Sequence, residues 1–201
     1  MIKDIWQGIL DTSLIEGLAV LFGLLYLLGI SRQKTWGWFC AMISTALYVY
    51  ICLSAQIYLE AGLQGFYLVM AFYGYSKWRK KEKVDFHIKV WPLKIHLANI
   101  FISSLVAICL AQLFIAFTNQ QSPYLDAFST VFSLLATFMV AKKILENWLY
   151  WIIIDIILVF LYASRELFLT SLQYLIFSII AAIAFVNWVV IYKKQRQDDG
   201  G

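Results

Sequence analysis

A single acid, Asp155, stands in the middle of an apolar run of helical length that extends from Trp148 to Tyr162. An aspartate near the centre of a bilayer costs about 2.5–3.5 kcal/mol on insertion scales, so such an acid usually marks a pathway, a ligand or a partner charge. Trp148, Trp151 and Asp155 are spaced three and four apart, which places them on one stripe of a helix. Indole faces attract flat or cationic groups, and a carboxylate adds charge or a paired hydrogen-bond acceptor. The stripe therefore predicts a binding site for a small, flat, cationic solute.

Other polar residues in apolar segments are weaker candidates for the same site. Gln64 and Gln173 can donate or accept hydrogen bonds, either to a solute or between helices. Glu16 and Asp126 stand near the starts of predicted helices, where the helix dipole favours an acid, so they either cap these helices or contribute to the site. Trp148 also suits an interfacial aromatic belt, and suits it better than the deeper Trp151.

The elements that position these residues must lie in a membrane. Hydrophobic residues make up 62% of the 201-residue chain and charged residues only 14%, whereas soluble proteins average about 25% charged residues. A helix that crosses the hydrocarbon core needs about 20 residues. Seven apolar segments reach this length, at about 13–30, 35–54, 57–77, 96–117, 124–141, 146–164 and 168–192. The sequence therefore predicts an all-α integral membrane protein with seven transmembrane helices.

The basic residues are divided unevenly between the two sides of these helices. Of the 16 Lys and Arg residues, 14 follow the odd-numbered segments, and the other side has only Lys3 and Arg165. The positive-inside rule then places the C-terminus in the cytoplasm and the N-terminus outside. The net charge of +4 reflects this topology, and no nucleic-acid partner is expected.

An internal repeat is indicated when the chain is shifted by 110 positions. The matched pairs are Glu16 with Asp126, Trp38 with Trp148, and Trp78 with Trp188. We expect a single transmembrane transporter domain over residues 1–201, with one repeat at about 13–78, a linker helix at about 96–117 and a second repeat at about 124–192. Both repeats have the same orientation, and such parallel repeats place a substrate site near the midplane between the halves.

The segment Glu146-Asn147-Trp148-Leu-Tyr-Trp151-Ile-Ile-Ile-Asp155, with Tyr162 and Leu172-Gln-Tyr174 after it, resembles the PnuC family of vitamin transporters, whose usual pattern is ENWxxWxxxN. The resemblance adds Asn147 and Tyr174 to the candidate site. It implies a 3+1+3 helix arrangement similar to SWEET transporters, in the bacterial cytoplasmic (inner) membrane. It also implies facilitated diffusion without a cofactor, an ATPase subunit or a coupling ion, with net uptake driven by a cytoplasmic vitamin kinase.

The chain departs from the family pattern at Asp155, where the usual residue is Asn. Members with an acid at this position look like the thiamine-transporting branch, often called PnuT. Thiamine has a fixed thiazolium charge and an aminopyrimidine that can pair with a carboxyl group. We therefore expect thiamine as the substrate, with nicotinamide riboside, which is also a cation, as the alternative. Riboflavin is neutral and gives Asp155 less to bind.

Two other classes of protein are weighed against a carrier. An intramembrane enzyme would need a catalytic set, but the sequence has no HExxH spacing and no glycine-rich phosphate loop, so we expect neither catalysis nor a metal. A membrane scaffold without transport activity stays as an alternative. The oligomeric state is left open, and a homo-oligomer is allowed. The candidate substrate-binding residues are Trp148, Trp151, Asp155, Asn147, Gln64, Tyr174, Glu16 and Asp126.

Overall fold

The computed structural model describes residues 14–54, 58–81, 87–118, 122–165 and 168–198. All of the elements named in these ranges are helices: α2 (Leu14–Ser31), α3 (Trp36–Ser54), α4 (Tyr58–Lys81), α5 (Leu93–Phe117), α6 (Pro123–Ala141), α7 (Asn147–Ser164) and α8 (Phe168–Asp198). The all-α, seven-helix prediction is confirmed. Lys3 and the predicted segment starts at 13 and 57 lie outside the described residues.

Six of the described helices are long and apolar enough to cross a membrane. The other described helix, α4, has sufficient length at 24 residues, but Glu60 and Gln64 fall in its first half and Lys77 and Arg79 near its end. The last helix, α8, continues six residues beyond the predicted end, because the Lys-, Arg- and Gln-rich tail consists of good helix formers that need no apolar surroundings.

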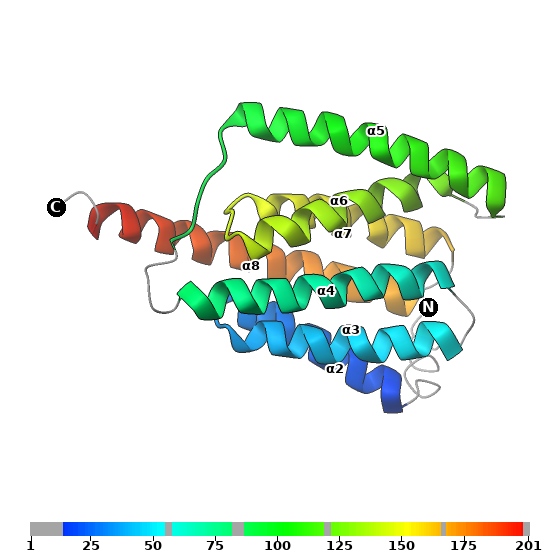
Figure 1. Cartoon of the computed structure of the whole chain (residues 1–201), viewed down its shortest axis with the longest axis horizontal. Coiled ribbons are helices and arrows are strands. Elements are labelled where there is room, and N and C mark those ends of the chain that lie inside the picture. The colour runs from blue at the N-terminus through cyan, green and yellow to red at the C-terminus, as the bar shows by residue number, and fades with distance from the viewer. Residues whose placement is uncertain (1–13, 55–57, 82–86, 119–121, 166–167, 199–201) are drawn as a thin grey trace.

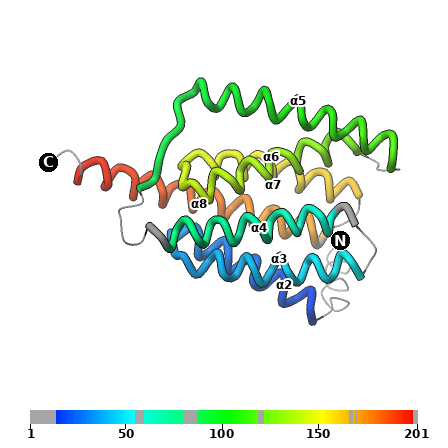
Figure 2. The backbone as a smooth tube through the Cα atoms, in the orientation of Figure 1, coloured from blue at the N-terminus to red at the C-terminus, as the bar shows by residue number. Residues whose placement is uncertain are grey.

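The helices pack as two sets of three with one helix outside (Figure 1). In the first set α3 packs between α2 and α4, and in the second α7 packs between α6 and α8. The sets meet through two helix pairs, α4 with α6 and α2 with α8. Helix α5 packs along α6 and contacts α7 through His96, whose Nδ1 lies 3.0 Å from the hydroxyl of Tyr150. The backbone trace in Figure 2 shows α5 along one side of the bundle. A site between the two sets is therefore bordered by α2, α4, α6 and α8, and side chains of α3 and α7 can reach it because these helices pack between the others.

Two hydrogen bonds join the sets at the end of the bundle where α2 and α6 end, on the left in Figure 1. The Nε1–H of Trp78 on α4 donates to the carbonyl oxygen of Ala141 at 3.3 Å, and the Nε1–H of Trp188 on α8 donates to the carbonyl oxygen of Ser31 at 3.1 Å. Donors and acceptors of the two bonds are each 110 positions apart. We call this end of the bundle the tryptophan end.

Four tryptophans pack together in the core at this end. Trp38 meets Trp78 edge-on at a centroid distance of 5.6 Å, and Trp148 meets Trp188 edge-on at 5.5 Å. The two pairs are joined by the contact between Trp78 and Trp188 at 6.3 Å. Gly74 makes room for the first pair, because a Cβ at that position would lie 2.5 Å from the indole of Trp38.

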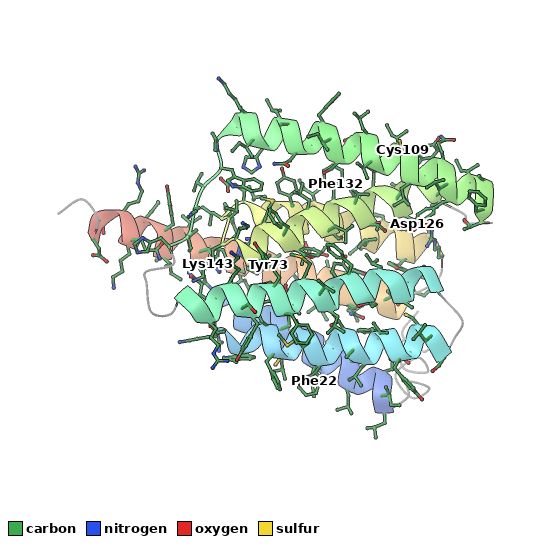
Figure 3. All side chains as sticks on the ribbon, viewed as in Figure 1. Phe22, Tyr73, Cys109, Asp126, Phe132 and Lys143 are labelled. Carbon is green, nitrogen blue, oxygen red and sulfur yellow. The ribbon has the colours of Figure 1, made fainter. Side chains whose placement is uncertain are left out.

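The chain turns sharply after α2 and after α6 at this same end. Gln33 and Lys143 adopt left-handed backbone angles, with φ of 55° and 56°. The ammonium of Lys143 donates a hydrogen bond to Oε1 of Gln33 at 2.9 Å and stands 4.7 Å from the ring centre of Trp78. Figure 3 shows Lys143 and Tyr73 at this end and Asp126 toward the opposite end. The turns therefore bring the two sets into contact through side chains as well as through helices.

Candidate functional site: a buried aspartate among tyrosines

Asp155 lies at the middle of α7, eight residues after its start at Asn147 and nine before its end at Ser164. Its side chain is 3% exposed. At 1.5 Å per residue the carboxylate is about 12 Å along the axis from either end of the helix, near the centre of a hydrocarbon core about 30 Å thick. Asp155 forms no ion pair or hydrogen bond with any residue in the described ranges. A buried carboxylate without a partner is costly, which is the condition expected of a ligand site.

A tyrosine from the next helix is a polar neighbour of the acid. Tyr174 on α8 interacts electrostatically with Asp155 and with Tyr67 on α4. Its ring is stacked on Tyr162 of α7, with centroids 5.3 Å apart and planes 7° apart. Tyr174, which entered the candidate site through the family resemblance, therefore lies beside the acid.

Tyr67 connects the acid to both sets of helices. It makes a polar contact with Ser133 on α6 and is an electrostatic neighbour of Tyr26 on α2. Through Tyr174 it also reaches Asp155. Side chains from α2, α4, α6, α7 and α8 thus converge at one level of the bundle, and we call Tyr26, Tyr67, Ser133, Asp155, Tyr162 and Tyr174 the central polar cluster.

The two glutamines of the sequence analysis lie near this cluster on the helices that line it. Gln173 precedes Tyr174 on α8, is half-buried, and makes a polar contact with Tyr48 on α3. Gln64 is half-buried on α4, one helical turn before Tyr67. At a spacing of three residues, Gln64 and Tyr67 share a face of α4.

The stripe of Trp148, Trp151 and Asp155 spans two different environments. Trp148 is 1% exposed and belongs to the tryptophan core, whereas Asp155 belongs to the central polar cluster. Trp151 is half-buried and packs both on the tryptophan core and on the apolar residues around Ile154. Of the two indoles, Trp151 is therefore the one positioned toward the acid.

Asn147 and Trp148 carry buried polar atoms that the fold does not use. The Nδ2 of Asn147 donates to the carbonyl oxygen of Ile144 at 2.6 Å, but its Oδ1 has no partner in the described part of the chain. The Nε1 of Trp148 is buried without a partner in the same ranges. These atoms lie at the tryptophan end, at least one helical turn away from the acid.

The two remaining acids lie away from Asp155. Asp126, in the first turn of α6, accepts a hydrogen bond from Arg165 at 2.8 Å, forming an ion pair just beyond the end of α7. Arg165 is ten residues beyond Asp155, a distance of about 15 Å along a helix. Glu16 is exposed in the first turn of α2 and is an electrostatic neighbour of Tyr48. Asp126 and Arg165 are both electrostatic neighbours of Tyr162, so their ion pair borders the central polar cluster.

Tyr26, Tyr67 and Ser133 were not found from the sequence. Each is an ordinary residue in an apolar segment, and nothing in the spacing along α2, α4 or α6 separates it from tyrosines or serines that face lipid or neighbouring helices. Gln64, three residues before Tyr67, was the one available signal.

The cluster can hold a flat cation. The carboxylate supplies the charge, the hydroxyls of Tyr67, Tyr174 and Ser133 supply donors and acceptors, and aromatic rings supply faces for stacking. No set of three or more His, Cys, Asp or Glu side chains arranged to hold a metal ion occurs in the ranges that the structure describes.

Known proteins of one family match this chain over nearly its whole length. The model of the nicotinamide mononucleotide transporter family matches residues 13–190. The nicotinamide riboside transporter PnuC of Escherichia coli (strain K12) is 27% identical over 92% of this chain and 89% of its own length. PnuC of Neisseria mucosa is 23% identical over 90% of this chain and 74% of its own length. The crystal structure of the vitamin B3 transporter PnuC has the same fold, with a TM-score of 0.71, 20% identity, and coverage of 90% of this chain and 82% of that one.

These comparisons correct the expectation of thiamine as the substrate. Both curated relatives are named for nicotinamide riboside. The argument from Asp155 failed because nicotinamide riboside is also a flat cation, so a buried carboxylate beside aromatic rings suits both solutes. The prediction of a transporter rather than an enzyme is confirmed, and the chain belongs to the nicotinamide mononucleotide transporter family.

Proposed function

We propose that this protein carries nicotinamide riboside across the membrane by facilitated diffusion, and that Asp155 binds the positively charged pyridinium ring. The observation that supports this most strongly is the burial of Asp155 at mid-helix without a cationic partner among the described residues. A solute that brings its own positive charge offsets the cost of burying the acid. The names of the curated relatives support the choice of solute.

In this proposal the solute lies between two repeats. One repeat covers about 13–78 and the other about 124–192, with α5 as the linker. The pairing of α4 with α6 and of α2 with α8 is what a two-fold relation between the sets would produce, since a shift of 110 positions converts one pair into the other. Transport then proceeds by rocking one set against the other around the central polar cluster.

The side chains of the site have different roles in the proposal. Asp155 binds the charge, Trp151 stacks on the ring, and Tyr174 with Gln64 binds the polar groups of the solute. Asn147 and Trp148 contact the solute from the tryptophan end, where their unused Oδ1 and Nε1 atoms are available.

The two acids at helix starts act at the entrance rather than at the binding level. Glu16 adds negative charge at the end opposite the tryptophans, which attracts a cation before it enters. The charge of Asp126 is balanced by Arg165, and this ion pair holds the start of α6 against the end of α7 at the same entrance.

The charge distribution supports placing the tryptophan end in the cytoplasm of a bacterial inner membrane. Arg32, Lys34, Lys142 and Lys143 all lie in the turns at this end, as the positive-inside rule requires for cytoplasmic loops. Net uptake then needs a reaction that keeps the solute inside, and phosphorylation by a cytoplasmic kinase would do so because it adds negative charge. A homo-oligomer is compatible with transport within each subunit.

Titration calorimetry on the detergent-purified full chain tests the proposal, with nicotinamide riboside and thiamine titrated into the same preparation. We expect saturable binding of nicotinamide riboside, and uptake of the labelled riboside by proteoliposomes down its gradient without ATP or an imposed ion gradient. Binding of thiamine with no response to the riboside would contradict the proposal. Uphill uptake driven by a proton gradient would contradict the facilitated-diffusion part alone.

A further inference from the structure

The two sets of helices are held together at the tryptophan end by bonds that can open. The donors, Trp78 Nε1 and Trp188 Nε1, are buried side-chain groups, and the acceptors are the carbonyl oxygens of Ala141 and Ser31. Each acceptor is the last residue of its helix, where carbonyls have no partner within the helix. Water can replace the indole at such a carbonyl, so the bond can break without disrupting a helix.

Each of these bonds joins one set to the other. The first runs from α4 to α6 and the second from α8 to α2, and these are the two pairs of described helices from different sets whose backbones pack together. Any motion that separates the sets at this end must therefore break both bonds. The edge-on tryptophan pairs and the contact between Trp78 and Trp188 fill the space between them.

A third contact reinforces the first bond. The ammonium of Lys143, in the turn after α6, lies against the ring of Trp78 at 4.7 Å and donates to Gln33 in the turn after α2. Lys143 is 9% exposed, so this cation–π contact is well shielded from water. Lys143 thus connects α4, the turn after α6 and the turn after α2 at one point.

We propose that the hydrogen bonds of Trp78 to Ala141 and of Trp188 to Ser31 form a latch that closes the carrier at the tryptophan end and breaks when that end opens to release the solute. This proposal rests on the proposed function for the solute and for the rocking motion. The latch itself is a statement about the empty protein, and it can be tested without any substrate.

A cysteine at the latch reports opening. Ser31→Cys is nearly isosteric, keeps the acceptor carbonyl, and places a thiol at a position that is 6% exposed when the latch is closed. The background carries Ala in place of the native Cys40, Cys52 and Cys109, so that a maleimide labels position 31 alone. The labelling rate of the purified, substrate-free protein then measures the population of the open end.

Replacement of the donor tryptophans by phenylalanine removes the N–H and keeps an aromatic ring. Trp38→Phe is the matched control, because Trp38 lies in the same core but its Nε1 is buried without a partner in the described ranges. We expect Trp78→Phe and Trp188→Phe each to raise the labelling rate about two- to twelvefold, the effect of losing one net hydrogen bond. Trp38→Phe should leave the rate near that of the background.

The comparison among these variants decides the proposal. Equal labelling in the three phenylalanine variants, or the fastest labelling in Trp38→Phe, would overturn the latch. Either donor variant suffices if the other does not yield folded protein by size-exclusion chromatography. The labelling experiment uses no substrate, so its outcome does not depend on whether the protein binds nicotinamide riboside. A failure of the proposed function would therefore be detected separately, by calorimetry.

Discussion

Replacement of Asp155 by Asn is the perturbation that most directly tests the binding of a cation. The change removes the charge and keeps the shape and one oxygen acceptor. At 3% exposure the carboxylate is poorly screened by water, and no described residue pairs with it, so its attraction is available to a bound cation. Two unit charges about 6–11 Å apart attract each other by about 1.5–3 kcal/mol at an effective dielectric constant of about 20, so the affinity for nicotinamide riboside should fall about 12- to 140-fold.

The same change should make the empty protein more stable. A neutral amide costs less to bury than an unpaired carboxylate, so thermal unfolding in detergent should shift upward in Asp155→Asn. A residue that costs stability in the empty protein and contributes to binding in the loaded one is typical of a functional site. A residue with a purely structural role would instead lose stability when replaced.

Reduced nicotinamide riboside provides the matched ligand, because its dihydropyridine ring is neutral while its amide and ribose are unchanged. Calorimetry on both proteins with both ligands gives four affinities, and Asp155→Asn should weaken the oxidised riboside selectively. An equal loss of affinity for both ligands would show that Asp155 contributes to binding through shape or hydrogen bonding and not through its charge. Unchanged affinity for the oxidised form would remove Asp155 from the site.

Two further predictions compare neighbouring residues. Trp151→Ala should weaken riboside binding more than Trp148→Ala, because Trp151 is the indole positioned toward the acid. Trp148→Ala should also lower stability by about 3–5 kcal/mol, since it empties a fully buried position. Calorimetry and thermal unfolding measure the two effects, and a larger loss of affinity in Trp148→Ala would move the site toward the tryptophan core. Gly74→Ala should destabilise the protein by about 1–3 kcal/mol, because its Cβ would lie 2.5 Å from the Trp38 indole. A Cβ at Gly62 would meet nothing within 4 Å, so Gly62→Ala should leave stability unchanged or raise it by up to about 1 kcal/mol through helix propensity. Equal melting temperatures for the two glycine variants would refute the close packing at Gly74.

The membrane fold was readily predicted because its signal is local. Each span needs only its own length and composition, and even α4 was located despite Glu60 and Gln64 within it. The acid was equally visible, since the cost of burying Asp155 depends on the depth of a residue in its own helix. The prediction of thiamine rather than nicotinamide riboside was wrong, because both solutes are flat cations and a single carboxylate can bind either of them.

The neighbours of the acid could not be predicted, because the sequence does not fix the rotation of each helix about its own axis. An apolar helix in a membrane has no strong hydrophobic face, so its pattern does not say which side turns toward another helix. Tyr67 and Ser133 meet because α4 and α6 pack together, a contact between segments far apart in the chain. Trp148 and Trp151 share a stripe, yet different helices surround them at different depths.

The helices, their membrane setting and the depth of Asp155 follow from residue type and spacing, because these depend on the free energy of transferring each segment into hydrocarbon. The tertiary structure decided which tyrosines surround the acid and which tryptophans join the two sets. The hydrogen bonds of Trp78 and Trp188 end on backbone carbonyls. Every residue has such a carbonyl, so only the packing of the helices selects Ala141 and Ser31 as the acceptors.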